Sequence, residues 1–320
     1  MKDVLYAPSA RIKTAAVLAL LLNASVSYAE QLLCSPAAVY RDDKSPIVYY
    51  LQKKDSGKSS RDLLVILHGS DCNSVRNVKA VAKLKKIYDT ADLLTVEKYG
   101  VTADLPYSNE AERKDCPPGY IEHDNPEQRV DDIDRVITCL RTNYNYAGII
   151  VTGGSEGAVV ALLLASKVNY VTATIAFGGG GRSFKDDVIH SMKYIYKDKD
   201  ALDKNIEGFS QFSDYVVSSE PFSIDMGNHG YSWWKIMLSH DQEKILAAIQ
   251  TPVLIMEGSE DTSSSPEKAR EMYNDLVKQG KKNIDFRWYE GYNHSLNLSV
   301  PDNSSDRVIR DVQKWLSGKI

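Results

Sequence analysis

One stretch decides the fold of this chain: Ile150–Val160, which reads IVTGGSEGAVV. An apolar run meets two glycines, a serine and a glutamate follow, and a further glycine opens a second apolar run. Glycines on both sides of Ser155 suit a strand that turns at once into a helix, because larger side chains would collide in so tight a turn. The stretch therefore predicts a strand over 148–151, a sharp corner at Ser155 and a helix over 156–167.

Strand-like and helix-like segments alternate on both sides of this corner. The other expected strands are apolar runs, at 47–51, 63–67, 93–96, 171–177, 252–256 and 284–289. The other expected helices show an apolar face or a capping residue followed by proline, at 127–142, 265–280 and 306–316. Strands that alternate with helices predict an α/β fold, a mostly parallel doubly wound sheet with helices on both faces.

Residues from about 182 to 250 interrupt this alternation. They are polar, helical in places and carry scattered aromatic residues, so we expect a helical lid inserted over the carboxyl edge of the sheet. Tyr231, Trp233 and Trp234 are candidates for the wall of an apolar substrate pocket. The alternative is that these aromatic side chains only pack the lid helices onto the core.

Residues able to do chemistry fall at the carboxyl ends of the predicted strands, where doubly wound sheets bind their ligands. Ser155 is the candidate nucleophile, since GGSEG matches G-x-S-x-G and a helix N-terminus favours developing negative charge. A serine hydroxyl needs a base, and the base needs an orienting acid. Of six histidines, only His294 follows the last predicted strand, which makes it the candidate base.

The orienting acid is expected after the strand at 252–256, where three carboxylates compete. Asp261 is the first choice, because it lies beyond the strand in a turn that reaches toward the loop of His294. Glu260 is the runner-up, and Glu257 is expected to stay on the strand as a structural acid. One helix and one strand separate Asp261 from His294, in the order that this type of fold requires.

A loop of the sequence His68-Gly69-Ser70-Asp71 follows the apolar run LLVIL. Its backbone N–H groups are expected to join the N–H of Glu156 in an oxyanion hole. Ser70 is the preferred donor, with Asp71 as the alternative, and His68 is expected to be a structural histidine.

Taken together, these motifs resemble the α/β-hydrolase superfamily over most of the chain, from about Leu63 to the C-terminus. The residues that carry the resemblance are His68-Gly69, Gly153–Gly157, Gly258–Asp261 and Asn293-His294. Within the superfamily the chain resembles the bacterial esterase-like and prolyl-oligopeptidase-like branch, through the Arg-x-x-Asp element at 129–132 that precedes the nucleophile strand. Glu156 departs from peptidases of this branch, which more often carry an aromatic residue after the nucleophile.

The resemblance implies a serine hydrolase that forms an acyl-enzyme on a small-molecule or short-peptide substrate. An ester is the favoured substrate, because the sequence shows no obvious charged group for gripping a peptide terminus. A small exported serine peptidase is the first alternative, and a non-catalytic binding protein on the same fold is the distant one. No histidine pair has metal-ligand spacing, so we expect no metal and no organic cofactor.

Residues 1–29 predict a signal peptide, and residues 30–320 the hydrolase domain. A basic start, a short apolar run at 15–22 and the small residues of Ser27-Tyr28-Ala29 fit a cleavable export signal. We expect a periplasmic or secreted protein with no stable membrane span after cleavage. With a net charge of −4 and no basic tract, nucleic acid is not an expected partner.

Four cysteines, Cys34, Cys72, Cys116 and Cys139, follow the predicted signal. An even number in an exported chain indicates two disulfides, although buried free thiols are an alternative. Three pairings are possible. Cys72–Cys116 is favoured, because both residues should lie in loops on the same side of the sheet.

Overall fold

The computed structural model describes residues 34–35, 38–54, 61–110, 112–298 and 304–320. The predicted signal peptide, residues 1–29, lies outside these ranges. The chain divides into a unit that ends at Ile47 and a unit over Val48–Ile320. In the first unit, three short strands pair antiparallel: β1 (Cys34–Ser35), β2 (Ala38–Tyr40) and β3 (Pro46–Ile47).

The second unit contains a seven-stranded sheet in the order β10-β9-β8-β7-β5-β6-β4. Its strands are β4 (Tyr49–Gln52), β5 (Asp62–Leu67), β6 (Asp92–Val96), β7 (Gly148–Gly154), β8 (Ala173–Phe177), β9 (Val253–Gly258) and β10 (Ile284–Tyr289). Only the edge strand β4 pairs antiparallel, with β6, and the other pairs of the sheet are parallel. The mostly parallel sheet predicted from the alternation is confirmed, whereas the predicted strand at 47–51 is divided between β3 and β4.

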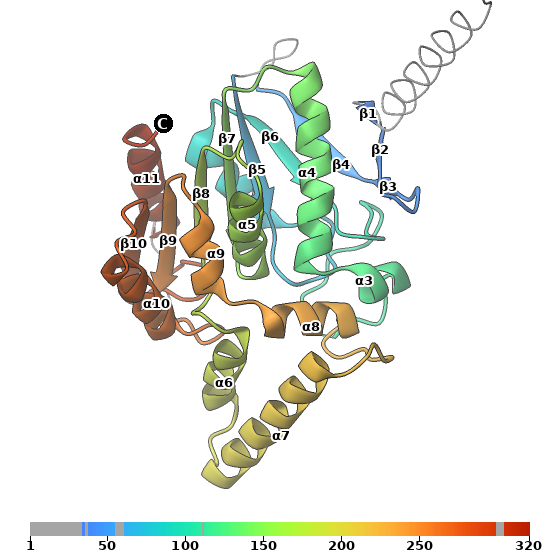
Figure 1. The fold of residues 1–320 in the computed structure, drawn as a ribbon, viewed down its shortest axis with the longest axis vertical. Coiled ribbons are helices and arrows are strands. Elements are labelled where there is room, and N and C mark those ends of the chain that lie inside the picture. Colours follow the sequence, from blue (N-terminus) through green and yellow to red (C-terminus); the bar gives the residue numbers. More distant parts are fainter. Residues whose placement is uncertain (1–33, 36–37, 55–60, 111, 299–303) are drawn as a thin grey trace, which may run out of the picture. The chain divides into compact units, whose positions relative to one another are not determined.

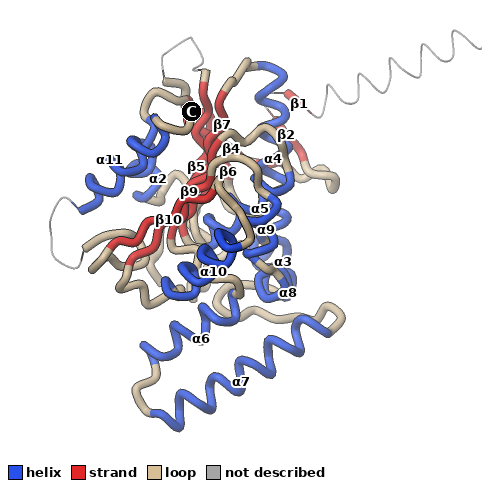
Figure 2. The backbone as a smooth tube through the Cα atoms, turned by 60° about the vertical axis from the view of Figure 1, so that its left-hand side comes forward, coloured by secondary structure: helices blue, strands red, loops and turns tan. Residues whose placement is uncertain are grey.

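Helices cover both faces of this sheet (Figure 2). One face carries α2 (Lys79–Leu84), the short helix η1 (Lys85–Tyr88) and α11 (Ser304–Ser317), and the other carries α4 (Pro126–Asn143), α5 (Glu156–Lys167), α9 (Gln242–Ala248) and α10 (Pro266–Lys278). The central strands β5 and β7 are therefore buried on both sides, which explains why their sequences are continuous apolar runs. The six-residue helices α2 and α3 (Pro118–His123) are too short to show a helical period in the sequence.

The helix before β7, α4, begins where the sequence supplies a cap. The Asn125 side chain accepts a hydrogen bond from the Gln128 N–H at 3.0 Å, and Pro126 fits the first helical turn. The apolar face predicted for this helix is buried against the rest of the molecule, at Val130, Ile133, Ile137 and Leu140. By contrast, α5 is buried on nearly all sides, as expected of a helix enclosed between the sheet and other helices.

The insertion at 182–250 separates β8 from β9 and is helical. It forms α6 (Phe184–Ile195), α7 (Lys199–Ser218), α8 (Tyr231–Ser239) and α9, of which α6 and α7 project away from the sheet while α9 lies beside α5 (Figure 1). Several aromatic side chains of the insertion form a small core of their own, together with Val159 of α5: Phe209, Trp233 and Trp234. Much of the aromatic content of the insertion therefore serves packing.

Candidate active site

Ser155 lies at the corner between β7 and α5, in a backbone conformation that residues other than glycine rarely adopt. Its φ is 56° and its ψ is −130°, and its N–H donates to the Phe177 carbonyl at 2.9 Å. Strain of this kind persists only where surrounding structure enforces it, and it is concentrated at functional sites. A Cβ on Gly157 would lie 2.4 Å from the Leu67 carbonyl oxygen, so the sharp corner does need glycine there.

Asp261 and His294 come together at the adjoining strand ends. The His294 Nδ1 lies 2.7 Å from the Asp261 Oδ2, and the Asp261 side chain is buried. The Asp261 carboxylate also accepts the N–H groups of Ser263 and Ser264 and the Ser264 hydroxyl. Burial acts to raise the pKa of Asp261, but its hydrogen bonds with His294 and Ser264 hold that pKa below its usual range. Asp261 is therefore an anion in hydrogen-bond contact with the His294 ring.

The two competing carboxylates behave differently. Glu260 is exposed, and the carboxylate that contacts His294 is that of Asp261. Glu257 is still part of β9 and fully buried, and burial, with the nearby charges of Asp261 and Asp187, raises its pKa well above the usual range. Burial likewise raises the pKa of Asp187 to about 7. The negative charge of this acidic group is therefore concentrated on Asp261.

Ser155 and His294 lie against the same turn at the end of β8. The Ser155 N–H is bonded to the Phe177 carbonyl, and a Cβ on Gly178 would lie 3.1 Å from the His294 Nδ1. Ser155 and His294 therefore both border the end of β8. This arrangement leaves the other ring nitrogen, Nε2, free of the Asp261 contact.

The predicted oxyanion loop lies directly against the serine. A Cβ on Gly69 would lie 3.5 Å from the Ser155 Cβ, and Ser70 is the next residue. Glu156 is the first residue of α5, so its N–H has no acceptor within the helix. Both N–H groups proposed for the oxyanion hole therefore belong to segments that meet at Ser155.

The side chain of Glu156 is the centre of a buried ionic cluster that sequence patterns did not predict. Its carboxylate contacts the Arg129 guanidinium, lies 3.8 Å from the Lys98 Nζ and accepts the Trp233 indole N–H at 2.7 Å. Burial acts to raise the pKa of Glu156, but the charges of Lys98 and Arg129 hold it far below the usual range. Arg129 also donates to the His68 carbonyl at 3.0 Å, which links the cluster to the oxyanion loop.

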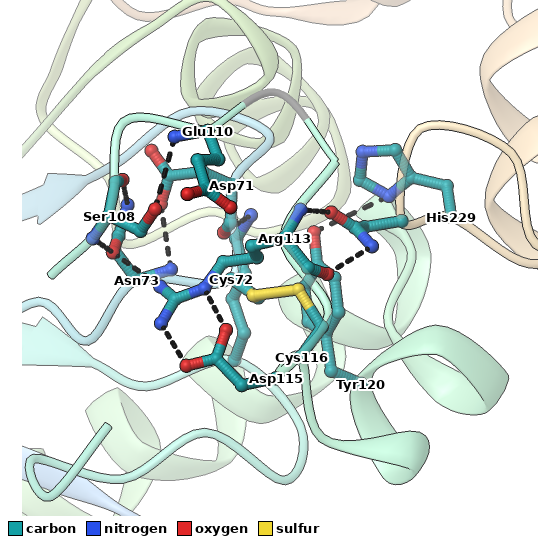
Figure 3. The surroundings of a disulfide bond; sticks show 12 residues. Asp71, Cys72, Asn73, Ser108, Glu110, Arg113, Asp115, Cys116, Tyr120 and His229 are labelled. Carbon is teal, nitrogen blue, oxygen red and sulfur yellow. Dashed lines mark hydrogen bonds and ion pairs between the residues drawn. A yellow bond between two sulfur atoms is a disulfide. The ribbon is translucent and has the colours of Figure 1, made fainter. Parts of the chain in front are cut away.

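The disulfide Cys72–Cys116 confirms the favoured pairing (Figure 3). It ties the chain two residues after Ser70 to the segment that leads into α3. The predicted oxyanion loop is therefore anchored covalently at one end.

A cavity of about 510 Å³ opens beside this loop. Its walls include Ser70, Asp71, Glu110, Trp233 and Trp234. Two of the three predicted pocket aromatics are thus brought next to the oxyanion loop. The third, Tyr231, lines a different cavity of about 940 Å³, and its hydroxyl donates to the Ser219 carbonyl at 2.5 Å.

Within the described ranges, no group of three or more histidine, cysteine or acidic side chains is arranged to hold a metal ion. Nor is any helix in those ranges both long and apolar enough to cross a bilayer.

The chain is similar to known proteins in family and in fold. The family model described as the prolyl oligopeptidase family matches residues 120–320, more than half of the chain. No curated protein matches the sequence. Solved structures do match. The esterase Est1E from Butyrivibrio proteoclasticus is 15% identical with a TM-score of 0.57, covering 88% of this chain and 98% of its own.

Two archaeal structures are similar to the same extent. The Pyrococcus furiosus esterase Pf2001 is 16% identical with a TM-score of 0.59, and the match covers 88% of this chain and 90% of that one. The monoacylglycerol lipase of Paleococcus ferrophilus is 16% identical with a TM-score of 0.55, covering 86% and 99%. At this level of identity the likeness shows the α/β-hydrolase fold.

Proposed function

Because this chain belongs to the prolyl oligopeptidase family, a family of α/β-hydrolase-fold serine hydrolases, we propose that it hydrolyses carboxylic esters through an acyl-enzyme on Ser155. The observation that carries this proposal is the strained conformation of Ser155, at φ 56°, beside the Asp261–His294 pair. A serine held in this conformation is presented to a ligand by the fold rather than used as an ordinary helix cap.

The chemistry follows from the bonds that each group makes. The Nδ1–H of His294 donates to Asp261, so Nε2 is the nitrogen that accepts the Ser155 proton as the serine oxygen attacks the ester carbonyl. The resulting imidazolium is stabilised by the Asp261 anion and returns the proton to the leaving alkoxide. Water, deprotonated by His294 in turn, then cleaves the acyl-enzyme to a carboxylic acid and restores the Ser155 hydroxyl.

The negative oxygen of the tetrahedral intermediate is assigned to the N–H groups of Ser70 and Glu156. Support comes from the approach of Gly69 to Ser155 and from the place of Glu156 at the start of α5, where the helix dipole also favours an anion. The cavity beside Ser70 has room for a small organic group on one side of the scissile bond. One solved structure similar to this chain is described as ferulic acid bound to Est1E.

A small peptidase is a second candidate, because the cavity beside Ser70 carries two exposed carboxylates, Asp71 and Glu110. The sequence alone predicts no charged group suited to gripping a peptide terminus, and these two carboxylates are the feature that supports the peptidase alternative. Arg113 in the same wall is already paired with Asp115, at 2.7 and 2.8 Å, so it does not neutralise them fully (Figure 3). A substrate with a free amino group would suit this wall.

The test is labelling of the chain from Glu30 onward with a fluorophosphonate probe. We expect the parent to label and Ser155→Ala and His294→Ala to remain unlabelled. Matched controls are Ser295→Ala, an exposed serine next to the proposed base, and His123→Ala, an exposed histidine; both should label like the parent. A folded parent that does not label would favour the non-catalytic binding protein.

Substrate class is decided by comparing p-nitrophenyl esters of short acids with aminoacyl and prolyl p-nitroanilides. We expect the esters to be cleaved with the higher kcat/KM. Anilides with a free amino group that exceed the esters, and that lose this advantage in Asp71→Asn, would establish the peptidase instead.

We also propose that the protein is exported from the cytoplasm. A disulfide is a feature of oxidising compartments, and residues 1–29 have the composition of a cleavable signal. N-terminal sequencing of the protein recovered from outside the cytoplasm should begin at Glu30.

A further inference from the structure

Two charged residues at the end of β6, Glu97 and Lys98, are buried and have no part in the chemistry above. The side chain of Lys98 is fully buried, and its Nζ lies 2.6 Å from the Gly69 carbonyl oxygen and 2.8 Å from the Asp71 carbonyl oxygen. A buried ammonium group is tolerated only where acceptors replace its hydration. In this protein the acceptors are backbone carbonyls of the oxyanion loop.

The Gly69 carbonyl belongs to the same peptide group as the Ser70 N–H. Because a trans peptide group is planar, its C=O and N–H point in opposite directions, so a bond that fixes the carbonyl also fixes the N–H. The next carbonyl, that of Ser70, accepts the Tyr120 hydroxyl at 3.3 Å. Three consecutive peptide groups, from Gly69 to Cys72, therefore each accept a side-chain hydrogen bond at their carbonyl oxygen.

The far end of the loop is held as well. Glu97 accepts the Ser74 hydroxyl at 2.5 Å and the Val75 N–H at 3.0 Å, and the Cys72–Cys116 disulfide lies between the two sets of contacts. Figure 3 shows this disulfide beside Tyr120. A rigid loop costs little reorganisation when charge develops in front of it, which is how oxyanion holes gain their effect.

Lys98 has an ionic partner in Glu156, the residue that follows the proposed nucleophile, at 3.8 Å. Its Nζ also lies 5.3 Å from the centre of the Tyr120 ring. Glu156 keeps the Arg129 guanidinium and the Trp233 indole if the ammonium is removed. Glu156 therefore keeps a counter-charge when the side chain at position 98 is neutral, and we expect such a variant to fold.

We propose that Lys98 is the positioning residue of the oxyanion hole: it fixes the Gly69–Ser70 peptide so that the Ser70 N–H faces the oxygen that becomes negative when Ser155 attacks. The inference rests on the proposed function. It goes further by naming a side chain that acts on the transition state through the backbone, without touching the substrate. The buried positive charge behind the loop also strengthens these N–H donors by polarising their peptide groups.

The experiment compares Lys98→Met with Lys281→Met in the chain from Glu30 onward. Lys281 is the control, because its Nζ also donates to two backbone carbonyls, those of Ala247 and Ile249 at the end of α9, but away from Ser155. Steady-state hydrolysis of p-nitrophenyl acetate gives kcat and KM. Infrared spectroscopy of the acetyl-enzyme, labelled with ¹³C at the carbonyl, reports the strength of the hydrogen bonds in the oxyanion hole.

For Lys98→Met we expect kcat to fall roughly 10²- to 10³-fold, the usual cost of one oxyanion donor, with KM changed less than about threefold. The acyl carbonyl stretch should move to higher frequency, which a purely structural role would not cause. Lys98→Arg should recover part of kcat, and Lys281→Met should keep both kcat and the parent stretch.

Each other outcome decides a separate question. A parent that neither labels nor hydrolyses esters refutes the proposed function. A parent that is active while Lys98→Met keeps its kcat and carbonyl stretch refutes the positioning role alone. Should Lys98→Met not fold, Lys98→Gln tests the same contact with a shorter neutral side chain: an unchanged kcat and stretch there would overturn the inference, and a several-fold loss with a shifted stretch supports it.

Discussion

Replacing Gly157 with alanine tests whether the close approach of α5 to β5 sets the position of Ser155. A Cβ at this position would lie 2.4 Å from the Leu67 carbonyl oxygen and 2.9 Å from that of His68. Both oxygens belong to the backbone at the end of β5, so neither can turn aside as a side chain would. The start of α5 must therefore move to accept the methyl group.

The size of the effect follows from these distances. Ordinary contact begins at 3.4 Å, so the helix must shift by about 1 Å from the Leu67 oxygen. Overpacking of this kind costs about 1–3 kcal/mol, which corresponds to a Tm lowered by roughly 2–6 °C for a unit of this size. A displacement of about 1 Å at the reacting atoms reduces kcat by about 10²-fold, because Ser155 and the Glu156 N–H move with the helix.

Gly208→Ala is the control. Gly208 lies in the middle of α7, and a Cβ there meets nothing within 4 Å. The same substitution should therefore leave kcat unchanged and stabilise the fold by up to about 1 kcal/mol through helix propensity. Thermal unfolding and hydrolysis of p-nitrophenyl acetate measure the two effects. A Gly157→Ala enzyme with parental Tm and kcat would refute the steric role of Gly157 in placing Ser155.

Three further predictions concern the acids and the disulfide. Asp261→Asn should lower kcat by about 10⁴-fold with little change in Tm, because the amide no longer stabilises the His294 imidazolium; a loss below tenfold in a pH-rate profile would contradict that role. Replacing Cys72 and Cys116 together by serine should reduce the free energy of unfolding by up to about 4 kcal/mol, the entropy of closing a loop of 44 residues, and denaturant titration measures it. Asp187→Asn should gain stability relative to the parent as pH rises from about 4 to 7. In the unfolded parent Asp187 ionises in this range, while burial keeps the carboxyl of the folded parent protonated up to its pKa of about 7. The free energy of unfolding of the parent therefore falls by up to about 4 kcal/mol across this range, whereas that of Asp187→Asn does not. A Tm difference that does not vary with pH in this window would contradict the burial argument.

The sequence by itself determined the sheet and the positions of the candidate residues along it. Apolar runs such as 63–67 that alternate with helices are typical of strands buried on both faces of a parallel sheet, and parallel strands end at the same edge. Ser155, Asp261 and His294 each follow such a strand, so the common direction of the parallel strands brings them to one edge. The tight turn at Ser155 could also be predicted from the sequence, because it depends on glycines that are adjacent to Ser155 in the chain.

The tertiary structure alone decided how the side chains behind that edge are partnered. Lys98 and Glu156 are 58 positions apart and lie on different elements, and no local period connects a residue after β6 with one at the start of α5. Likewise, Trp233 and Tyr231 are two positions apart on α8, yet they line separate cavities. Hydrophobic periodicity specifies which face of an element is buried. It does not specify which partner that face meets, because packing between distant segments depends on the arrangement of the whole sheet and its helices.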